Sequence, residues 1–323
     1  MPLVSSMDHV GPITRCVGDA PLVLQAIGGP DHGDPLTLND LVEDFSGQLE
    51  KTIEGMVVGV PRRYFFEGGD PEVIEVVEKS LAVFSELGAK LREVTLPDCD
   101  VAYEAANATF SEIVDANGDA LAQNPHGFSA EFKKRYQAMA KYRGADYEAA
   151  QAYRVKFKRG IAEVMQHCDV LATPTSTVAA APIEKRPPNH AKERRKNACI
   201  FDFTGQPSIS VPCGFTREGL PVGLMLSGRV LEDSTVLRFA RRSRGLLLGI
   251  RIIRRYQSHN DLFSYLYCLD GQQEMERREA NSSCILFWDR CCLQRSCSRT
   301  AAPTGAHKSC RGGQRAAPSG GEC

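Results

Sequence analysis

The sequence has no apolar run that approaches the roughly 20 residues needed to span a bilayer. Its best apolar stretch, residues 246–253, is interrupted by Arg251. The first ten residues contain no basic segment followed by an apolar one, as a secretory signal would, and no repeat of fixed period is present. With an ordinary share of hydrophobic (42%) and charged (24%) residues, these absences exclude a membrane-spanning, collagenous, coiled-coil or wholly disordered protein. We expect a cytoplasmic globular protein without disulfides.

The chain also lacks a sizeable net charge, since its 323 residues carry a formal charge of −1. No global field therefore draws it to nucleic acid or to an anionic membrane. The basic clusters at 133–135 and 192–196 contain no aromatic residues that could stack on bases, and such clusters are usually solvated faces. We expect no direct nucleic-acid site and no membrane partner.

This near-zero charge conceals two different compositions. Residues 251–323 contain 7 of the 12 cysteines, and their 11 basic and 7 acidic residues give a balance of +4. Residues 1–250 carry 28 basic and 33 acidic residues, a balance of −5. From residue 284 onward the sequence has no sustained helical or strand period, and such a segment buries too little apolar surface to offset its ordering entropy. We expect the tail, residues 243–323, to be largely disordered or to be translated out of frame.

Several catalytic and binding motifs are missing. No C-x₂-C pair occurs, so the cysteines of the tail predict no zinc site; these residues are Cys284, Cys291, Cys292, Cys297 and Cys310, with His307 nearby. There is no G-x-x-x-x-G-K-[ST] or G-x-G-x-x-G phosphate loop and no G-x-S-x-G elbow. The nearby Ser5, Ser6, Asp8 and His9 are too close in sequence to form a catalytic triad. The five cysteines before residue 250 are predicted to be reduced and mostly buried.

What is present is an alternation of strand-like and helix-like segments. A strand is expected over 56–60, ended by Pro61. Asp70 is a good N-cap and Pro71 fits the first helical position, so a helix with one apolar stripe should run from there to Gly88. A second strand over 89–96 would complete a βαβ unit. The sequence therefore predicts an α/β fold.

The same patterns predict the remaining elements. Helices are expected over 102–116, 147–167, 192–203 and 232–242, and strands over 169–172, 208–211 and 222–226, the last two joined as a hairpin. Thr173 and Thr175 follow the strand over 169–172, at the end where open α/β sheets place their ligands. This makes them candidate substrate-binding residues.

Three stretches resemble the amidase signature family, which includes general amidases and the A subunit of the tRNA-dependent glutamyl/aspartyl amidotransferase. They are SSMDHVGPITR at 5–15, DVLATPT at 169–175, and FTGQPSISVPCG at 203–214 followed by GLPVGL at 219–224. Their order and spacing agree with the family from about Leu3 to Arg242. The resemblance implies a mixed β-sheet covered by helices on both faces, hydrolysis of carboxamide C–N bonds through an acyl-serine, and no metal or organic cofactor.

The family's Ser–Ser–Lys triad and glycine/serine-rich loop have no counterpart here, because no G-G-S-S-G-type stretch exists in the sequence. We therefore expect residues 1–242 to be the C-terminal portion of an amidase signature domain, with the N-terminal part missing. It would hold no catalytic residues and be inactive alone. The resemblance would place Arg135 against a substrate carboxylate and Glu232, or Asp233, as an acidic residue of the pocket. A surface role for Arg135 is an equal alternative.

Three interpretations remain open at this point. The parent enzyme would act on a small carboxamide, as a homodimer or with amidotransferase partner subunits. Alternatively, the chain is a truncated, non-catalytic binding or assembly subunit similar to the amidotransferase A subunit. A third possibility is a fragment that does not fold stably, because an incomplete sheet exposes strand edges and core surface.

Overall fold

The computed structural model describes residues 3–247, except 35–36, 39–41, 183, 185–186 and 188, together with the backbone of residues 285–286. The chain divides into one compact unit over residues 1–290 and a second over 291–323. All described residues lie in the first unit. Predictions made for the cysteine cluster and for disorder of the tail fall almost entirely outside the described residues.

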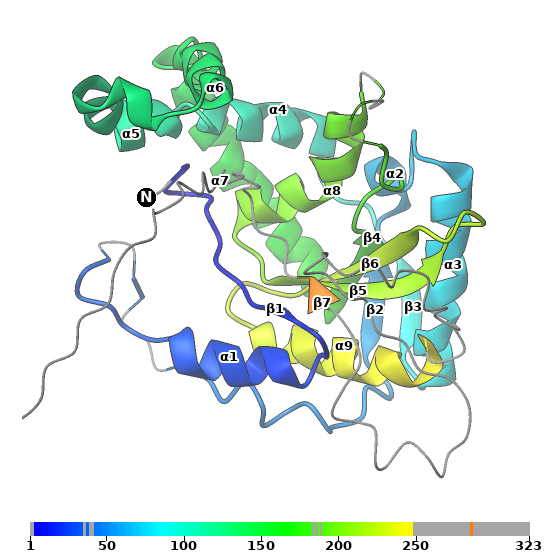
Figure 1. Cartoon of the computed structure of the whole chain (residues 1–323). Coiled ribbons are helices and arrows are strands. Elements are labelled where there is room, and N and C mark those ends of the chain that lie inside the picture. The colour runs from blue at the N-terminus through cyan, green and yellow to red at the C-terminus, as the bar shows by residue number, and fades with distance from the viewer. Residues whose placement is uncertain are drawn as a thin grey trace, which may run out of the picture. The chain divides into compact units, whose positions relative to one another are not determined.

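The described strands form one mixed sheet in the order β1-β7-β5-β6-β4-β2-β3 (Figure 1). Strand β2 pairs in parallel with β3 and β4, whereas β4 and β5 both pair antiparallel with β6. The sheet therefore confirms the expected mixed topology. The strands are β1 (Ile13–Thr14), β2 (Val57–Val60), β3 (Lys90–Glu93), β4 (Val170–Pro174), β5 (Ser208–Phe215), β6 (Pro221–Ser227) and β7 (Ile285–Leu286).

The predicted βαβ unit is present as β2, α3 and β3. Helix α3 spans Pro71–Glu86, and the side chain of Asp70 accepts a hydrogen bond of 2.9 Å from the backbone N–H of Glu72. Its apolar stripe, which includes Val73 and Phe84, is buried. Strand β3 is shorter than the expected 89–96, and all four of its residues are exposed.

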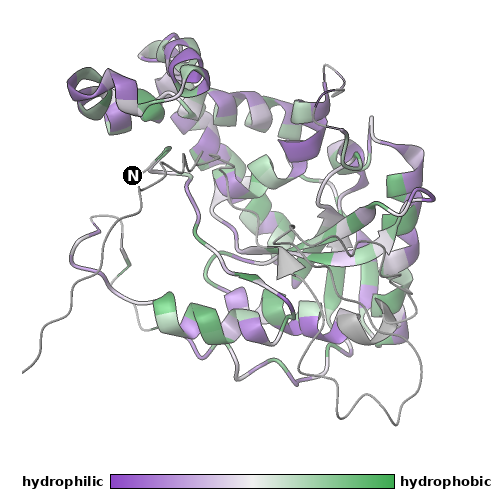
Figure 2. Ribbon diagram, viewed as in Figure 1, coloured by the Kyte–Doolittle hydropathy of each residue, from purple (hydrophilic) through white to green (hydrophobic). Residues whose placement is uncertain are grey.

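Helices cover both faces of the sheet (Figures 1 and 2). One core lies between the sheet and α3, α9 and α1, and a second lies between the sheet and α2, α4, α7 and α8. The amidase-like layer arrangement expected from the sequence is therefore confirmed. The helices are α1 (Asp19–Ile27), α2 (Arg62–Phe65), α3, α4 (Cys99–Thr109), α5 (Glu112–Gln123), α6 (Ala130–Ala140), α7 (Ala145–Met165), α8 (His190–Thr204) and α9 (Asp233–Leu247), with a short 3₁₀ turn over Pro125–Gly127.

The structure corrects some of the element boundaries. The single helix expected over 102–116 is two helices, α4 and α5, because the chain turns at Phe110, whose ring is buried in the core. Helices α1 and α6 were not predicted. Helix α9 does not end at Arg242 but continues to Leu247. No helix within the described ranges is both long and apolar enough to cross a bilayer.

Candidate substrate site at the end of strand β4

Two threonines lie at the carboxyl end of β4, on the face of the sheet that is covered by α8. Because side chains alternate along a strand, Thr173 and Thr175 share the face of Leu171, which belongs to the same core as Phe201 of α8. The hydroxyl oxygens of Thr175 and Ser210 lie 2.6 Å apart in a hydrogen bond, although β6 lies between β4, which Thr175 directly follows, and β5, which carries Ser210. The hydroxyl of Thr173 is fully buried and has no hydrogen-bond partner. A buried hydroxyl without a partner is costly, so this position is unusual in a folded protein.

A glycine makes room for this pair of hydroxyls. The backbone carbonyl of Gly223 on β6 accepts a hydrogen bond of 2.9 Å from the backbone N–H of Thr175. A Cβ atom at this position would lie 2.7 Å from the hydroxyl oxygen of Ser210 and 2.8 Å from that of Thr175. Both distances are below normal contact, so the GLPVGL stretch places a glycine where a larger residue would disrupt the pair.

Helix α8 contributes a third buried polar residue, Asn197. Its amide nitrogen donates to the carbonyl oxygens of Phe65 (3.1 Å) and Pro174 (2.8 Å), whereas its amide oxygen has no partner. Asn197 was not selected from the sequence. The sequence does contain a signal for its burial, because Asn197 lies on the same face of the helix as the buried Ile200 and Phe201, at spacings of three and four. A polar residue within such an apolar stripe is the signal that could have identified it.

The turn that follows β4 is held by α8 through charged groups. The ammonium of Lys196 lies 2.7 Å from the carbonyl oxygen of Glu67 and 2.9 Å from the carboxylate of Glu193. The hydroxyl of Thr177 donates to the same carboxylate at 2.9 Å. These contacts fix the loop beside Thr175, and Lys196, 6% exposed, is fully engaged in them. The lysine therefore supports the site and is not placed as a free base.

Glu232 lies at the opposite end of β4. Its carboxylate is 3.0 Å from the guanidinium of Arg229, which donates to the backbone carbonyls of Met165 and Cys168, just before β4 begins. The structure thus brings Thr173 and Thr175 together but separates Glu232 from them by the length of the strand.

Arg135 lies on α6, half-buried, with its guanidinium 4.9 Å from the centre of the Phe110 ring. Asp233, the other acidic candidate, is the first residue of α9, and burial raises the pKa of its carboxyl. The substrate-binding roles of Arg135, Thr173, Thr175 and Glu232 stay predictions.

The fold and these motifs agree with one family of known proteins. Residues 1–237 match the Amidase family. The chain belongs to this family. It is 34% identical over 268 residues to the A subunit of glutamyl-tRNA(Gln) amidotransferase from Myxococcus xanthus, a match that covers 73% of this chain and 54% of that protein. It is 33% identical over 265 residues to the corresponding protein of Moorella thermoacetica, with the same coverage.

Solved structures of amidase signature proteins share the fold. The structure of the glutamyl-tRNA(Gln) amidotransferase A subunit from Thermotoga maritima superposes with a TM-score of 0.61 at 31% identity, covering 74% of this chain and 53% of that one. A protein from a vestigial complex related to an s-triazine catabolic enzyme gives a TM-score of 0.69 at 23% identity, covering 76% and 55%, and shows the fold alone. The chain spans about half the length of the curated relatives it matches.

Three buried cysteines of this amidase signature chain are not suited to act as nucleophiles. Burial raises the pKa of the Cys99 and Cys213 thiols to about 12 and that of Cys168 to about 11. A thiol needs a lowered pKa to react at neutral pH, so these residues are structural. The expectation that the five cysteines before residue 250 are mostly buried is confirmed, since all of them except Cys16 are buried.

The serine and histidine near the start of the chain are also held in structural contacts. The hydroxyl of Ser6 lies 2.7 Å from the carboxylate of Glu112 and 2.8 Å from the guanidinium of Arg154. The ring of His9 instead contacts the carbonyl of Met7 at 2.8 Å. The serine hydroxyl therefore has a carboxylate and a guanidinium beside it rather than an imidazole base. No cluster of three metal-ligating residues is found among the described residues.

Arg154 is a structural residue that was not identified from the sequence. Its guanidinium, only 7% exposed, donates to the backbone carbonyls of Phe203 (2.7 Å) and Ser6 (2.6 Å) as well as to the Ser6 hydroxyl. Burial lowers its pKa, and the nearby Glu112 counteracts this shift. These contacts tie the first matched motif, SSMDHVGPITR, to α7 and α8.

Proposed function

We propose that this chain provides the substrate-binding side of an amidase signature site, in which the C–N bond of a small carboxamide is cleaved through an acyl-serine. The observation that supports this most directly is the pair of buried atoms without partners at the end of β4, the Thr173 hydroxyl and the Asn197 amide oxygen. A carboxamide offers both N–H donors and a carbonyl acceptor, and these complement an amide oxygen and a hydroxyl.

The nucleophile, the base and the oxyanion donors are not supplied by this chain in the proposal. The sequence contains no G-G-S-S-G-type loop. Without these groups an acyl transfer loses most of its rate enhancement. The chain alone is therefore expected to bind a carboxamide but not to hydrolyse it.

Two measurements on the purified 323-residue chain test this. Ammonia release from acetamide, glutamine and benzamide should not exceed the buffer blank, with an intact amidase signature enzyme as the positive control. Ligand-observed NMR with the same three amides should show binding to the wild type and a clear loss for Thr173→Val, which keeps the shape but removes the hydroxyl. Turnover by the chain alone, or equal binding by the variant, contradicts the proposal.

A second function is favoured by the curated relatives, which are amidotransferase A subunits. The chain would then act as a non-catalytic assembly subunit that keeps the docking surface of those proteins. Co-purification with the partner subunits of a glutamyl-tRNA(Gln) amidotransferase tests this, with the Thermotoga maritima protein as the competitor. Retention that the competitor removes supports it, and the absence of retention contradicts it.

The proposed domain division places the amidase part at 1–242 and an unrelated tail at 243–323. The family match ends at residue 237, close to this boundary, and the composition changes beyond it. Sequencing of the coding DNA and mass spectrometry of tail peptides test the out-of-frame origin. An intact frame with detected tail peptides refutes it.

A further inference from the structure

Two basic segments that lie far apart in the sequence, 133–135 and 192–196, meet at one aromatic ring. The guanidinium carbon of Arg135 on α6 lies 4.9 Å from the centre of the Phe110 ring, and that of Arg195 on α8 lies 5.9 Å from it. Cations within about 6 Å of a ring centre are attracted to the face of the ring. Neither segment contains an aromatic residue of its own, so the end of α4 supplies the ring for both.

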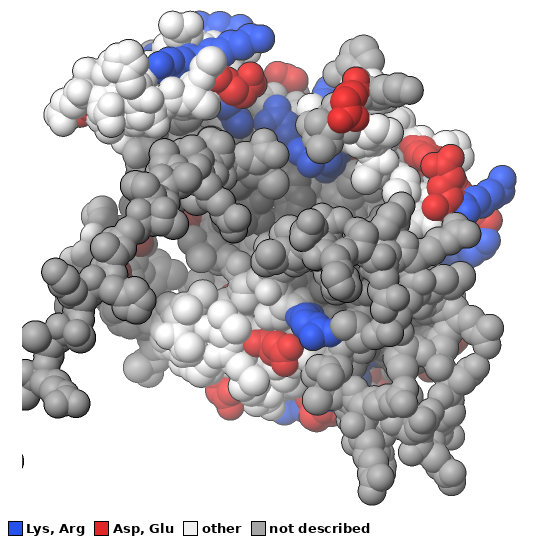
Figure 3. All heavy atoms as spheres, viewed as in Figure 1, with Lys and Arg blue, Asp and Glu red and all other residues white. Residues whose placement is uncertain are grey.

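A second ring of α4 brings a third cation to the same place. The ammonium nitrogen of Lys192 lies 5.3 Å from the centre of the Tyr103 ring, and the guanidinium carbon of Arg195 lies 5.8 Å from it. Both rings are buried, whereas Lys192 is exposed and Arg195 is half-buried. Basic side chains gather on this face of the molecule, beside α4 and α8, in Figure 3. We call Arg135, Lys192 and Arg195 the basic cluster.

The guanidinium of Arg195 is held in place but has few hydrogen-bond partners. Its Nη2 lies 3.5 Å from Oδ1 of Asn107, which is a long contact, and its Nε is buried without a partner. A guanidinium has five N–H donors, so most of those of Arg195 have no acceptor among the described residues. Because two rings and one amide already restrict its orientation, this side chain loses less entropy when it binds a ligand.

The charge of the basic cluster is not neutralised by the carboxylates that surround it. Neither Lys192 nor Arg195 forms an ion pair within the part of the chain that the structure describes. The adjacent Glu193 instead contacts the ammonium of Lys196 and the hydroxyl of Thr177, both at 2.9 Å. Lys192 is also the third residue of α8, where the helix dipole is already positive. An anion between these cations would therefore relieve their mutual repulsion.

We propose that the basic cluster binds the phosphate group of a small molecule, with the Arg195 guanidinium and the Lys192 ammonium as its principal contacts. A guanidinium can donate two parallel hydrogen bonds to one oxyanion, and an ammonium acts as a point charge. A phosphate monoester carries nearly two negative charges at neutral pH, so it can neutralise both cations, whereas a carboxylate neutralises one. Arg135 adds a third positive charge. This site goes beyond the proposed function, because it requires neither a carboxamide nor an acyl-serine.

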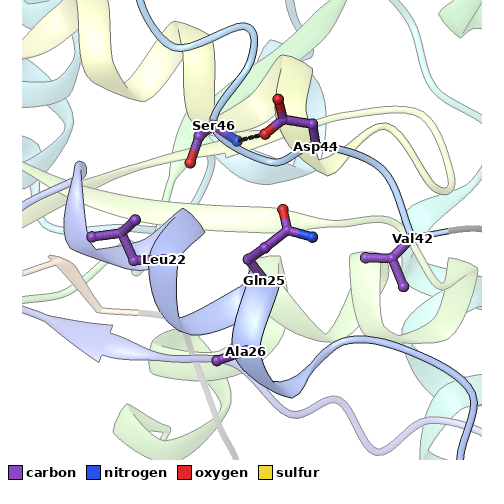
Figure 4. A pocket seen from close by; sticks show the side chains of 6 residues that line it. All are labelled: Leu22, Gln25, Ala26, Val42, Asp44 and Ser46. Atoms are coloured by element: carbon purple, nitrogen blue, oxygen red, sulfur yellow. Dashed lines mark hydrogen bonds between the residues drawn. The ribbon is translucent and has the colours of Figure 1, made fainter.

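The open pocket of about 530 Å³ beside α1 has the opposite character (Figure 4). Its lining residues are Leu22, Gln25, Ala26, Val42, Asp44 and Ser46. Helix α1 forms a largely apolar wall, and the other wall is polar, because the Asp44 carboxylate there accepts hydrogen bonds of 3.0 Å from the backbone N–H groups of Ser46 and Gly47. A carboxylate in the wall repels an anion. We therefore expect phosphate to bind at the basic cluster and not in this pocket.

Titration of the full chain with glycerol phosphate, followed by isothermal calorimetry at constant ionic strength, tests the proposal. We expect the wild type to bind saturably and Lys192→Gln/Arg195→Gln to bind at least about tenfold more weakly, because charge-assisted hydrogen bonds are lost. The control Lys90→Gln/Lys156→Gln removes the same charge from exposed lysines of β3 and α7 and should bind like the wild type. Dimethyl phosphate and acetate, which each carry one negative charge, should bind more weakly than glycerol phosphate.

Thermal unfolding provides a second measurement. A ligand that binds only the folded state raises the Tm, so glycerol phosphate should raise the Tm of the wild type and of the control but not that of Lys192→Gln/Arg195→Gln. If this double variant does not fold, Lys192→Gln alone, at an exposed position, should still weaken binding, by a smaller factor.

Three results would overturn the proposal: no saturable binding by the wild type, unchanged binding by the Lys192 variants, or an equal loss in the control. Tighter binding of dimethyl phosphate than of glycerol phosphate would also overturn it, because the site would then not select a dianion.

Discussion

Helices α3 and α1 pack against the same core, yet they differ in how completely their apolar residues are used. In α3 one stripe is apolar, and it is buried against the sheet, with the Phe84 ring 6.1 Å from that of Phe239. In α1 both sides are apolar and one of them faces outward. The difference shows that α3 is complete within this chain, whereas α1 has the composition of an element that is covered on two sides.

The two helices also differ at their first residues. The side chain of Asp70 caps α3, whereas α1 begins after Gly18, which has no side chain to provide a cap. A short helix without a cap is marginal by itself and depends on packing. The stability of α1 is therefore expected to respond to whatever covers it, and that of α3 to the core of this chain.

The largest difference in the free energy of unfolding is expected between a truncated apolar residue in α3 and one in α1. Phe84→Ala should lower the free energy of unfolding by about 3–5 kcal/mol, because it leaves a cavity in a packed core. Leu22→Ala should change it by less than about 0.5 kcal/mol, as is usual for exposed positions. Urea denaturation followed by circular dichroism measures both. An equal loss in the two variants would mean that α1 is already covered.

A smaller loss in the free energy of unfolding is expected on changing Arg154, which connects the SSMDHVGPITR segment to α7. Arg154→Met removes three hydrogen bonds to Ser6 and Phe203 and should cost roughly 2–3 kcal/mol, because the donor is charged and buried and the Phe203 carbonyl is also buried. Arg154→Lys should recover part of this loss. Proteolysis should then cut the segment before β1 more readily in the Met variant, with α3 still protected. Unchanged proteolysis would show that the segment is held by other contacts.

Removing the N-cap of α3 is expected to lower the free energy of unfolding by about 1 kcal/mol. Asp70→Ala removes the acceptor for the backbone N–H of Glu72 and should lower the free energy of unfolding by about that amount. Asp70→Asn retains an acceptor and serves as the control, with a loss of a few tenths of a kcal/mol at most. Thermal unfolding of the three proteins in parallel measures the difference. If Asn and Ala are equivalent, the carboxylate charge rather than the hydrogen bond stabilises the helix start.

The sequence predicted the βαβ unit and the hairpin well, because local signals there agree with the tertiary structure. Asp70, Pro71 and the stripe that includes Val73 each predict the same helix. For α1 such signals are missing: its apolar residues follow no single stripe, and no side chain caps it. The division between α4 and α5 depends on the burial of Phe110, which is a tertiary contact that a local pattern does not contain.

As with the fold, the residues of the site that local sequence features mark were predicted, and those that depend on long-range contacts were not. Thr173 and Thr175 were identified because strand ends are local features, and the structure places them on the same face with Ser210. Asn197 and Arg154 were missed, since their importance comes from long-range contacts to Pro174 and Ser6. Glu232 was selected because the family resemblance implies an acidic residue after the last strand, but its partner Arg229 places it at the other end of β4.

The smallest expected effect concerns Asp233, at the start of α9 near the polar wall of the pocket. Burial raises the pKa of its carboxyl, and the nearby Glu43 raises it further. The folded state therefore holds the proton more tightly than the unfolded state, where aspartate titrates near about 3.9. It follows by linkage that the stability contributed by Asp233 is present below this value and is lost as the pH rises through the folded pKa.

Asp233→Asn should remove this dependence, because asparagine has nearly the same shape as aspartate but does not ionise. At about pH 3.5 the variant and the wild type should have the same free energy of unfolding. As the pH rises to neutral, the free energy of unfolding of the variant should become larger than that of the wild type. Urea titrations across that range measure it. Asp44→Asn is the control, since Asp44 lies in the same wall but is exposed. A gap that is constant with pH would contradict the assignment, because it would reflect packing rather than the carboxyl proton.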